Sequence, residues 1–162
     1  MTMRWRMGLT VMLMMVVAVS ASIAGQSDEF ASPRIVFVCG HGAAKSVIAA
    51  AYFNKLAVER GLRERAIYRG ASPQAELSAA TLKGVRDDRL SVPTTKPASI
   101  TATDVTAATH IFAIGCSRPA QASSSGKAEN WTDVPEVSDG YAASRDTIKR
   151  RVEQLLDQLA KK

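Results

Sequence analysis

Short apolar runs alternate with longer stretches of helical periodicity through most of the chain. Residues 34–39, 66–70 and 110–114 are brief runs rich in apolar side chains, and each ends in a glycine or is followed by one. Such runs are typical of strands buried on both faces of a parallel sheet. Between and after them, apolar residues recur every three or four positions, which predicts helices.

Two of the predicted helices have strong patterns. Residues 45–60 carry apolar side chains at helical spacing and precede Gly61, a common C-terminal stop. Residues 141–160 form an amphipathic helix that would close the chain. Its apolar positions are Ile148, Val152, Leu155, Leu156 and Leu159.

The remaining segments have weaker patterns. A helix is expected over residues 76–87, and a shorter one from Thr101 to Ala107, where Thr101 and Asp104 have the spacing of a capping box. The segment 91–99, interrupted by two prolines, is expected to be mostly loop with a short extended piece. Residues 120–129 are small and polar and are also expected to form a loop.

Alternating strands and helices predict an α/β fold whose parallel sheet is covered on both sides. Ligands of such sheets bind at the carboxyl ends of the strands. Cys39 ends the first predicted strand, and Cys116 follows a later one. Both thiols are therefore expected at the functional edge of the sheet.

Composition narrows the class of protein. The chain has 162 residues, 46% hydrophobic and 22% charged, which fits a globular protein with one domain and excludes a disordered chain. Two cysteines are too few for a zinc-finger set or a cystine-rich scaffold. The net charge of +6 favours anionic partners, but no aromatic–basic cluster indicates nucleic acid.

The N-terminal segment resembles a secretory signal. Arg4 and Arg6 precede a long apolar stretch, and Ser22 and Ala24 occupy the −3 and −1 positions of a signal-peptidase site. The alternative is an uncleaved membrane anchor. The predicted organisation is a signal peptide (1–24), a linker (25–33) and an α/β domain (34–162). We expect an exported protein, periplasmic or secreted, without a stable membrane span after cleavage.

Residues 39–46 carry the candidate chemistry, because a cysteine, five compact residues, a cation and a hydroxyl lie between a strand and a helix. A loop of small residues can direct several backbone amides at one tetrahedral oxyanion. The helix N-terminus and the Lys45 ammonium would add positive potential. The same groups, with the Ser46 hydroxyl, would favour a thiolate at Cys39. The pattern predicts a nucleophilic sulfur beneath a bound oxyanion.

This segment resembles the motif of the low-molecular-weight protein tyrosine phosphatase superfamily, which includes thioredoxin-coupled arsenate reductases. The resemblance implies a three-layer α/β sandwich with a four-stranded, mostly parallel sheet and no cofactor. It implies Cys39 as nucleophile and Lys45 in the place of the family's arginine. The implied substrate-binding residues are Gly40, His41, Gly42, Ala43, Ala44 and Ser46.

The chain departs from the family pattern in its cation and its acid. Lysine supplies one point charge where arginine supplies a planar fork, so the charge is kept but the in-line geometry is expected to suffer, and weak or absent phosphatase activity is one of the alternatives. The family's general acid lies in an Asp-Pro loop before the last helix, a place occupied here by residues 131–136. Asp133 is the first candidate for this acid and Glu136 the second. A turn-capping role for Asp133 is the alternative.

Cys116 resembles the second cysteine of the arsenate reductases, which attacks the arsenic adduct on the first. The further resolving cysteine of that branch is missing, so a two-cysteine cycle would need an external thiol reductant. A structural Cys39–Cys116 disulfide, or a merely buried Cys116, is the alternative.

The two histidines have different expected roles. His41 would contact the anion or face solvent, whereas His110 is expected to be structural. A metal site is not expected, because the Cys and His spacing matches no standard pattern.

Three functions are compatible with these features. The first is a cysteine-dependent phosphatase that hydrolyses phosphate monoesters. The second is a thiol-dependent arsenate reductase. The third is an oxyanion-binding domain with weak or no catalysis. All three share a phosphate-like or arsenate-like ligand.

Overall fold

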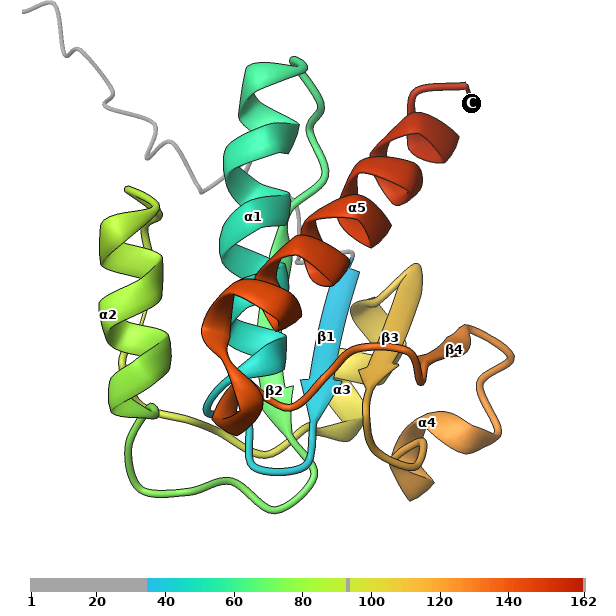
Figure 1. The fold of residues 1–162 in the computed structure, drawn as a ribbon. Helices are drawn as coiled ribbons and strands as arrows, with labels where there is room; N and C mark the ends of the chain where they lie inside the picture. The colour runs from blue at the N-terminus through green and yellow to red at the C-terminus, as the bar shows by residue number, and fades with distance from the viewer. Residues whose placement is uncertain (1–34, 93, 162) are drawn as a thin grey trace, which may run out of the picture.

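Four short strands form one parallel sheet in the computed structural model, which describes residues 35–92 and 94–161 (Figure 1). The strands are β1 (Ile35–Cys39), β2 (Ala66–Gly70), β3 (His110–Ile114) and β4 (Ala128–Trp131), in the order β2-β1-β3-β4. The helices are α1 (Lys45–Glu59), α2 (Ala79–Asp87), α3 (Ala102–Ala107), α4 (Ala120–Ser123) and α5 (Tyr141–Leu159), with the 3₁₀ turn η1 (Val137–Asp139) before α5. The predicted signal peptide, 1–24, and linker, 25–33, lie outside the described residues.

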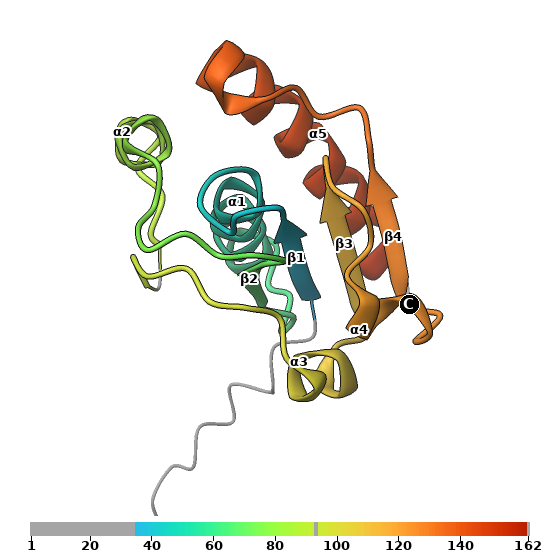
Figure 2. The same ribbon diagram turned by 90° about the horizontal axis from the view of Figure 1, so that it is seen from below.

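The sheet is covered on both faces, as the sequence pattern predicts. Helices α1, α2 and α5 lie on one side and α3 on the other, which gives three layers (Figure 2). Alternate side chains of β1 face the two layers: Phe37 belongs to the larger core beneath α1 and α5, and Val38 to the smaller core beneath α3 and α4. The predicted α/β sandwich is confirmed, and all four strands are parallel.

The larger core is centred on stacked rings. The ring centroids of Phe37 and Phe112, on neighbouring strands, lie 5.5 Å apart, and Trp131 of β4 lies 4.9 Å from Phe112. Aromatic pairs at such distances add to the burial of their surfaces. They fix the three strands whose carboxyl ends carry the site.

Side-chain caps set the starts of two helices. The Thr101 hydroxyl accepts from the Asp104 amide and the Asp104 carboxylate accepts from the Thr101 amide, so the predicted capping box is confirmed. Helix α2 starts three residues later than predicted, at Ala79, because the Ser78 hydroxyl accepts from the Thr81 amide. Ser78 is therefore the cap of the helix, and Leu77 before it packs in the larger core.

The prediction of a loop over residues 120–129 is wrong. This segment contains α4 and the first two residues of β4, an edge strand whose Ile111↔Ala128 and Ile114↔Trp131 pairings join it to β3. Glu129 and Asn130 are exposed, as suits an edge strand, so the segment lacks the apolar run that marks a central strand.

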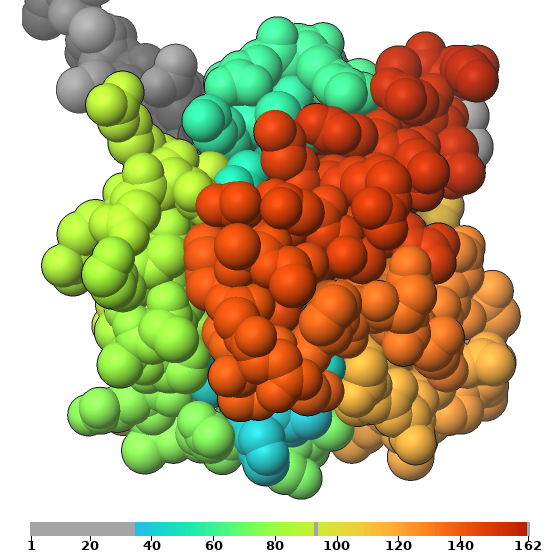
Figure 3. All heavy atoms as spheres, in the orientation of Figure 1, coloured from blue at the N-terminus to red at the C-terminus, as the bar shows by residue number. Residues whose placement is uncertain are grey.

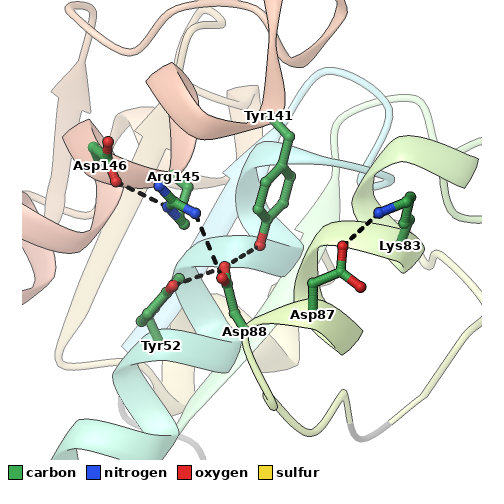
Figure 4. Close-up of polar contacts among 7 residues, drawn as sticks. All are labelled: Tyr52, Lys83, Asp87, Asp88, Tyr141, Arg145 and Asp146. Atoms are coloured by element: carbon green, nitrogen blue, oxygen red, sulfur yellow. Dashed lines mark hydrogen bonds and ion pairs between the residues drawn. The ribbon is translucent and has the colours of Figure 1, made fainter.

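A polar cluster joins three helices on the α1 side of the sheet (Figure 4). Asp88, the residue that caps the end of α2, accepts hydrogen bonds of 2.8 Å from the hydroxyls of Tyr52 in α1 and Tyr141 in α5. Arg145 of α5 lies 3.5 Å from the same carboxylate. Burial, followed by the hydrogen bond to Asp88, raises the pKa of both phenols above the ordinary value of 10.0. Both tyrosines therefore stay neutral donors.

Candidate functional site

The loops that follow the four strands meet at one edge of the sheet, the lower edge in Figure 1. The segment after β1, coloured blue, reaches the surface there, beside the green segment that follows β2 (Figure 3). Parallel strands present all their carboxyl ends on one side, so residues distant in sequence converge at this edge.

Cys39 is buried at the end of β1, and its Sγ lies 3.1 Å from the Ser46 Oγ in the first turn of α1. The two residues are seven positions apart in sequence, and the loop between them folds back so that their side chains meet. The predicted contact between a hydroxyl and the candidate nucleophile is therefore present.

The loop passes tightly over the end of β2. Gly42 has φ +62°, and a Cβ on it would lie 2.7 Å from the Gly70 backbone nitrogen. Only glycine combines this left-handed conformation with so close an approach. Gly42 thus shapes the loop rather than lining the cavity.

Four carbonyls of the loop region accept hydrogen bonds from the segment that follows β2. The donor–acceptor pairs are Ala71–Cys39 at 3.0 Å, Ser72–Gly40 at 2.8 Å, Gln74–His41 at 3.1 Å and Ser78–Ala43 at 3.0 Å. In a trans peptide the amide N–H points opposite to the preceding carbonyl, and the described residues contain no cis peptide. The amides that follow these four carbonyls therefore point away from that segment.

Lys45, the first residue of α1, holds its ammonium inside the site. Its side chain is only 6% exposed, and its Nζ lies 2.5 Å from the Oε1 of Glu136, whose side chain is 62% exposed. Gly115, just after β3, has φ +60°, and a Cβ on it would lie 2.1 Å from that Nζ. The missing side chain of Gly115 is what leaves room for the ammonium.

These groups surround a cavity of about 240 Å³. Its lining residues are Cys39, Gly40, His41, Ala43, Ala44, Lys45, Gln74, Ser78, Gly115 and Glu136. His41 is exposed, with its Nδ1 3.3 Å from the Ser72 carbonyl oxygen. Sequence reasoning missed Gln74, Ser78 and Gly115. Of these three, only Gly115 had a signal in the sequence, because it is a glycine directly after the predicted strand 110–114.

The structure places the two candidate acids differently. Asp133 pairs with Arg151 of α5, at 2.9 Å, and is not among the residues that line the cavity. Its slight burial opposes ionisation, but the Arg151 hydrogen bond prevails and lowers the pKa of the Asp133 carboxyl. Glu136, the second candidate, lies at the cavity on Lys45.

Cys116 lies beside the strand that ends in Cys39. Its Sγ is 3.8 Å from the carbonyl oxygen of Val38, and both cysteines are free thiols. Burial, and next the nearby Cys39, raise the pKa of the Cys116 thiol, while Lys45 acts in the opposite direction. Cys116 is therefore a half-buried thiol within electrostatic range of the candidate nucleophile.

Within residues 35–92 and 94–161, no group of three or more His, Cys, Asp and Glu side chains is arranged to hold a metal ion. No helix in this described part is long and apolar enough to cross a membrane.

The sheet order, its two helical layers and the cysteine loop between β1 and α1 define the low-molecular-weight protein tyrosine phosphatase fold, which the arsenate reductases share. YfkJ from Bacillus subtilis superposes with a TM-score of 0.71 at 19% identity, over 79% of this chain and 94% of its own. No family model matches the chain, and no curated protein matches it in sequence.

Members of both branches have this fold. A thioredoxin-dependent arsenate reductase from Corynebacterium glutamicum gives a TM-score of 0.68 at 20% identity, over 79% of this chain and 62% of its own. A low-molecular-weight phosphotyrosine phosphatase from Vibrio cholerae gives 0.67 at 14% identity, over 78% and 96%. At these identities the likeness establishes the fold, and any activity has to be argued from the site.

Proposed function

We propose that the chain is a cysteine-dependent hydrolase of phosphate monoesters. The observation that carries this proposal is the cavity that brings together the Cys39 sulfur, the Ser46 hydroxyl beside it and the buried Lys45 ammonium. A thiolate needs nearby donors and positive charge, and a tetrahedral oxyanion needs the same groups. One small cavity would satisfy both requirements.

In the proposed reaction the Cys39 thiolate attacks phosphorus, and a sulfur–phosphorus bond forms as the bond to the leaving oxygen breaks. Lys45, the loop amides that point away from the 71–78 segment and the first turn of α1 would stabilise the equatorial oxygens. Water then attacks phosphorus, and inorganic phosphate and the free thiolate are released.

The leaving oxygen needs a proton from a carboxyl at the cavity. We assign this role to Glu136, because it lines the cavity, whereas Asp133 pairs with Arg151. Glu136 would be displaced from Lys45 by the substrate, take up the proton of a monoanionic phosphate ester and then pass it to the leaving oxygen. The assignment replaces the first choice made from sequence with the second. Cys39, Lys45 and Glu136 are thus the proposed catalytic residues, and the loop backbone the proposed binding element.

Hydrolysis of an aryl phosphate by the reduced protein tests this proposal. Cys39→Ser should reduce turnover to background, and Glu136→Gln should lower kcat by about 10²-fold, as is usual for loss of a general acid. Asp133→Asn is the matched control and should leave kcat unchanged. Undiminished activity in Cys39→Ser would reject the mechanism. Stabilisation by phosphate without any turnover would instead favour an inactive oxyanion-binding domain.

A second candidate, thiol-dependent arsenate reduction, is favoured by the Cys116 sulfur on the carbonyl that precedes Cys39. The Cys39 thiolate would displace water from arsenate, and the Cys116 thiolate would attack the Cys39 sulfur. A disulfide forms, two electrons pass to arsenic, and arsenite leaves. An external thiol would reduce the disulfide.

The raised pKa of Cys116 gives this candidate a distinct pH profile. At neutral pH Cys116 is a thiol, so reduction should accelerate as pH rises towards and above its ordinary value of 9.0. Arsenate-dependent loss of free thiols measures the reaction. If Cys116→Ala consumes arsenate as fast as the parent protein, the reductase candidate is rejected.

A further inference from the structure

The Lys45–Glu136 pair has one fixed partner and one movable partner. Lys45 is almost fully buried, is held in the first turn of α1, and packs against Gly115 where a Cβ would lie 2.1 Å from Nζ. The Glu136 side chain is 62% exposed. Rotation about its side-chain bonds can therefore release the Glu136 carboxylate to water, while the Lys45 ammonium stays buried.

The backbone around Glu136 is anchored on both sides. The carbonyl of the preceding residue, Pro135, accepts a 2.9 Å hydrogen bond from the Ser144 hydroxyl of α5. The carbonyl of Glu136 itself accepts from the Asp139 amide at 3.1 Å, and Val137 is buried. Exchange of the carboxylate thus requires a side-chain rotation and no movement of the loop.

A buried ammonium must keep an anionic or polar partner, because an unpaired charge in this environment is costly. Among the residues that line the cavity, Lys45 and Glu136 are the ones that carry formal opposite charges at neutral pH. An oxyanion that enters competes with the Glu136 carboxylate for the Lys45 ammonium, because Lys45 is the one Lys or Arg among the residues that line the cavity. Two anions would otherwise share one ammonium at close range, which is repulsive.

We propose that Glu136 is an internal competitor for the oxyanion, an autoinhibitory contact that a ligand displaces from Lys45. The inference rests on the proposed oxyanion site and concerns its regulation. In the empty protein, Glu136 neutralises the cation that would otherwise attract any small anion. An anion binds by exchange, and the displaced carboxylate moves to the mouth of the cavity.

The apparent affinity for the anion equals the intrinsic affinity multiplied by the fraction of molecules in which Lys45 is free, so the Glu136 contact weakens binding. A single ion pair with one exposed partner is weak, so removing the competitor should tighten anion binding by about two- to fivefold. A carboxylate that stays at the mouth of the cavity without contacting Lys45 should weaken anion binding less, because solvent screens its charge.

Equilibrium binding of inorganic phosphate to the reduced, full-length protein, measured by calorimetry, tests the exchange. Glu136→Gln should bind phosphate about two- to fivefold more tightly than the parent. Glu136→Asp keeps the charge but shortens the side chain by one methylene, so it should also bind more tightly. Asp133→Asn, which removes an exposed carboxylate of the same loop, should bind as the parent does.

Two results would overturn the proposal. One is a Glu136→Gln protein that binds phosphate no more tightly than Asp133→Asn. The other is a Glu136→Asp protein that binds like the parent while Glu136→Gln binds more tightly, which would assign the effect to charge at the mouth and not to the contact. If Glu136→Gln binds phosphate more tightly than the parent but the parent hydrolyses no aryl phosphate, the exchange is supported and the hydrolase is rejected. If the parent shows Cys39-dependent turnover but Glu136→Gln binds phosphate no more tightly, the hydrolase is supported and the exchange is rejected.

Discussion

Asp88 and Glu136 are both carboxylates that pair with residues of α1, yet their surroundings differ. Asp88 is 17% exposed and accepts hydrogen bonds from two phenols, with an arginine at 3.5 Å (Figure 4). Glu136 is 62% exposed and contacts one ammonium at the rim of a cavity. In the Asp88 cluster the carboxylate is the buried group around which its partners gather. In the Lys45–Glu136 pair the carboxylate is the exposed partner and the ammonium is the buried one.

This difference is the reason why we give the Asp88 cluster a structural role and propose a ligand-directed role for the Lys45–Glu136 pair. The Asp88 cluster joins α1, α2 and α5, and any entering ligand would have to break several hydrogen bonds at once. The Lys45–Glu136 pair has one contact to exchange and an adjoining cavity of about 240 Å³. The number of partners of a titratable group and its exposure, taken together, therefore help to tell a structural group from a candidate site residue.

The largest expected effect on stability comes from Asp88→Ala. The substitution leaves the partly buried Tyr52 and Tyr141 hydroxyls without their acceptor, which should lower the free energy of unfolding by about 2–4 kcal/mol. Denaturant unfolding measures the loss. Phosphate affinity of the folded variant should not change.

Asp87→Ala is the matched control for Asp88→Ala. Asp87 is the neighbouring acid, and it pairs with the exposed Lys83 of the same helix (Figure 4). Such a surface pair contributes little, so stability should stay within about 0.5 kcal/mol of the parent. Equal losses in the two variants would show that the Asp88 cluster is not the structural joint described here.

Gly115→Ala should affect both stability and anion binding. An alanine at φ +60° costs about 1–2 kcal/mol, and its Cβ would displace the Lys45 ammonium. Phosphate affinity should fall by about tenfold, the effect of losing one charge-assisted contact of roughly 1.4 kcal/mol. Calorimetry measures the affinity and denaturant unfolding the stability.

Gly126→Ala separates these two effects. Gly126 has φ +66°, but a Cβ on it would meet nothing within 4 Å. It should lose similar stability through the backbone alone and keep the parent's phosphate affinity. If Gly115→Ala binds phosphate as well as Gly126→Ala does, Lys45 is not the partner of the anion.

The smallest effect is one of pH. All three tyrosines of the chain have pKa values raised above 10.0, through burial first and, for Tyr52 and Tyr141, through Asp88 next. The stability that depends on the neutral phenols is therefore complete below pH 10 and is lost as pH rises beyond it. Absorbance titration of the folded protein should show each phenol less than half ionised at pH 10, where an ordinary tyrosine is half ionised. A tyrosine that ionises at 10 or below would contradict this burial.

Sequence pattern predicted the local parts of the site because they lie within a few residues of one another. Cys39 at a strand end, and Lys45 and Ser46 at a helix start, follow from apolar periodicity and a short compact loop. The capping box at Thr101 is equally local. The edge strand β4 was missed, since its exposed Glu129 and Asn130 give no apolar signal.

Our proposal of Glu136 in place of Asp133 rests on contacts between segments that are distant in sequence. The two acids are three positions apart in one loop, and no local rule separates them. Arg151 of α5 draws Asp133 away, while the space beside Gly115 lets Glu136 reach an ammonium 91 positions earlier in the chain. Periodicity reports how each residue relates to its neighbours along the backbone. Which charges meet across a cavity depends on how the packed helices and strands place their side chains.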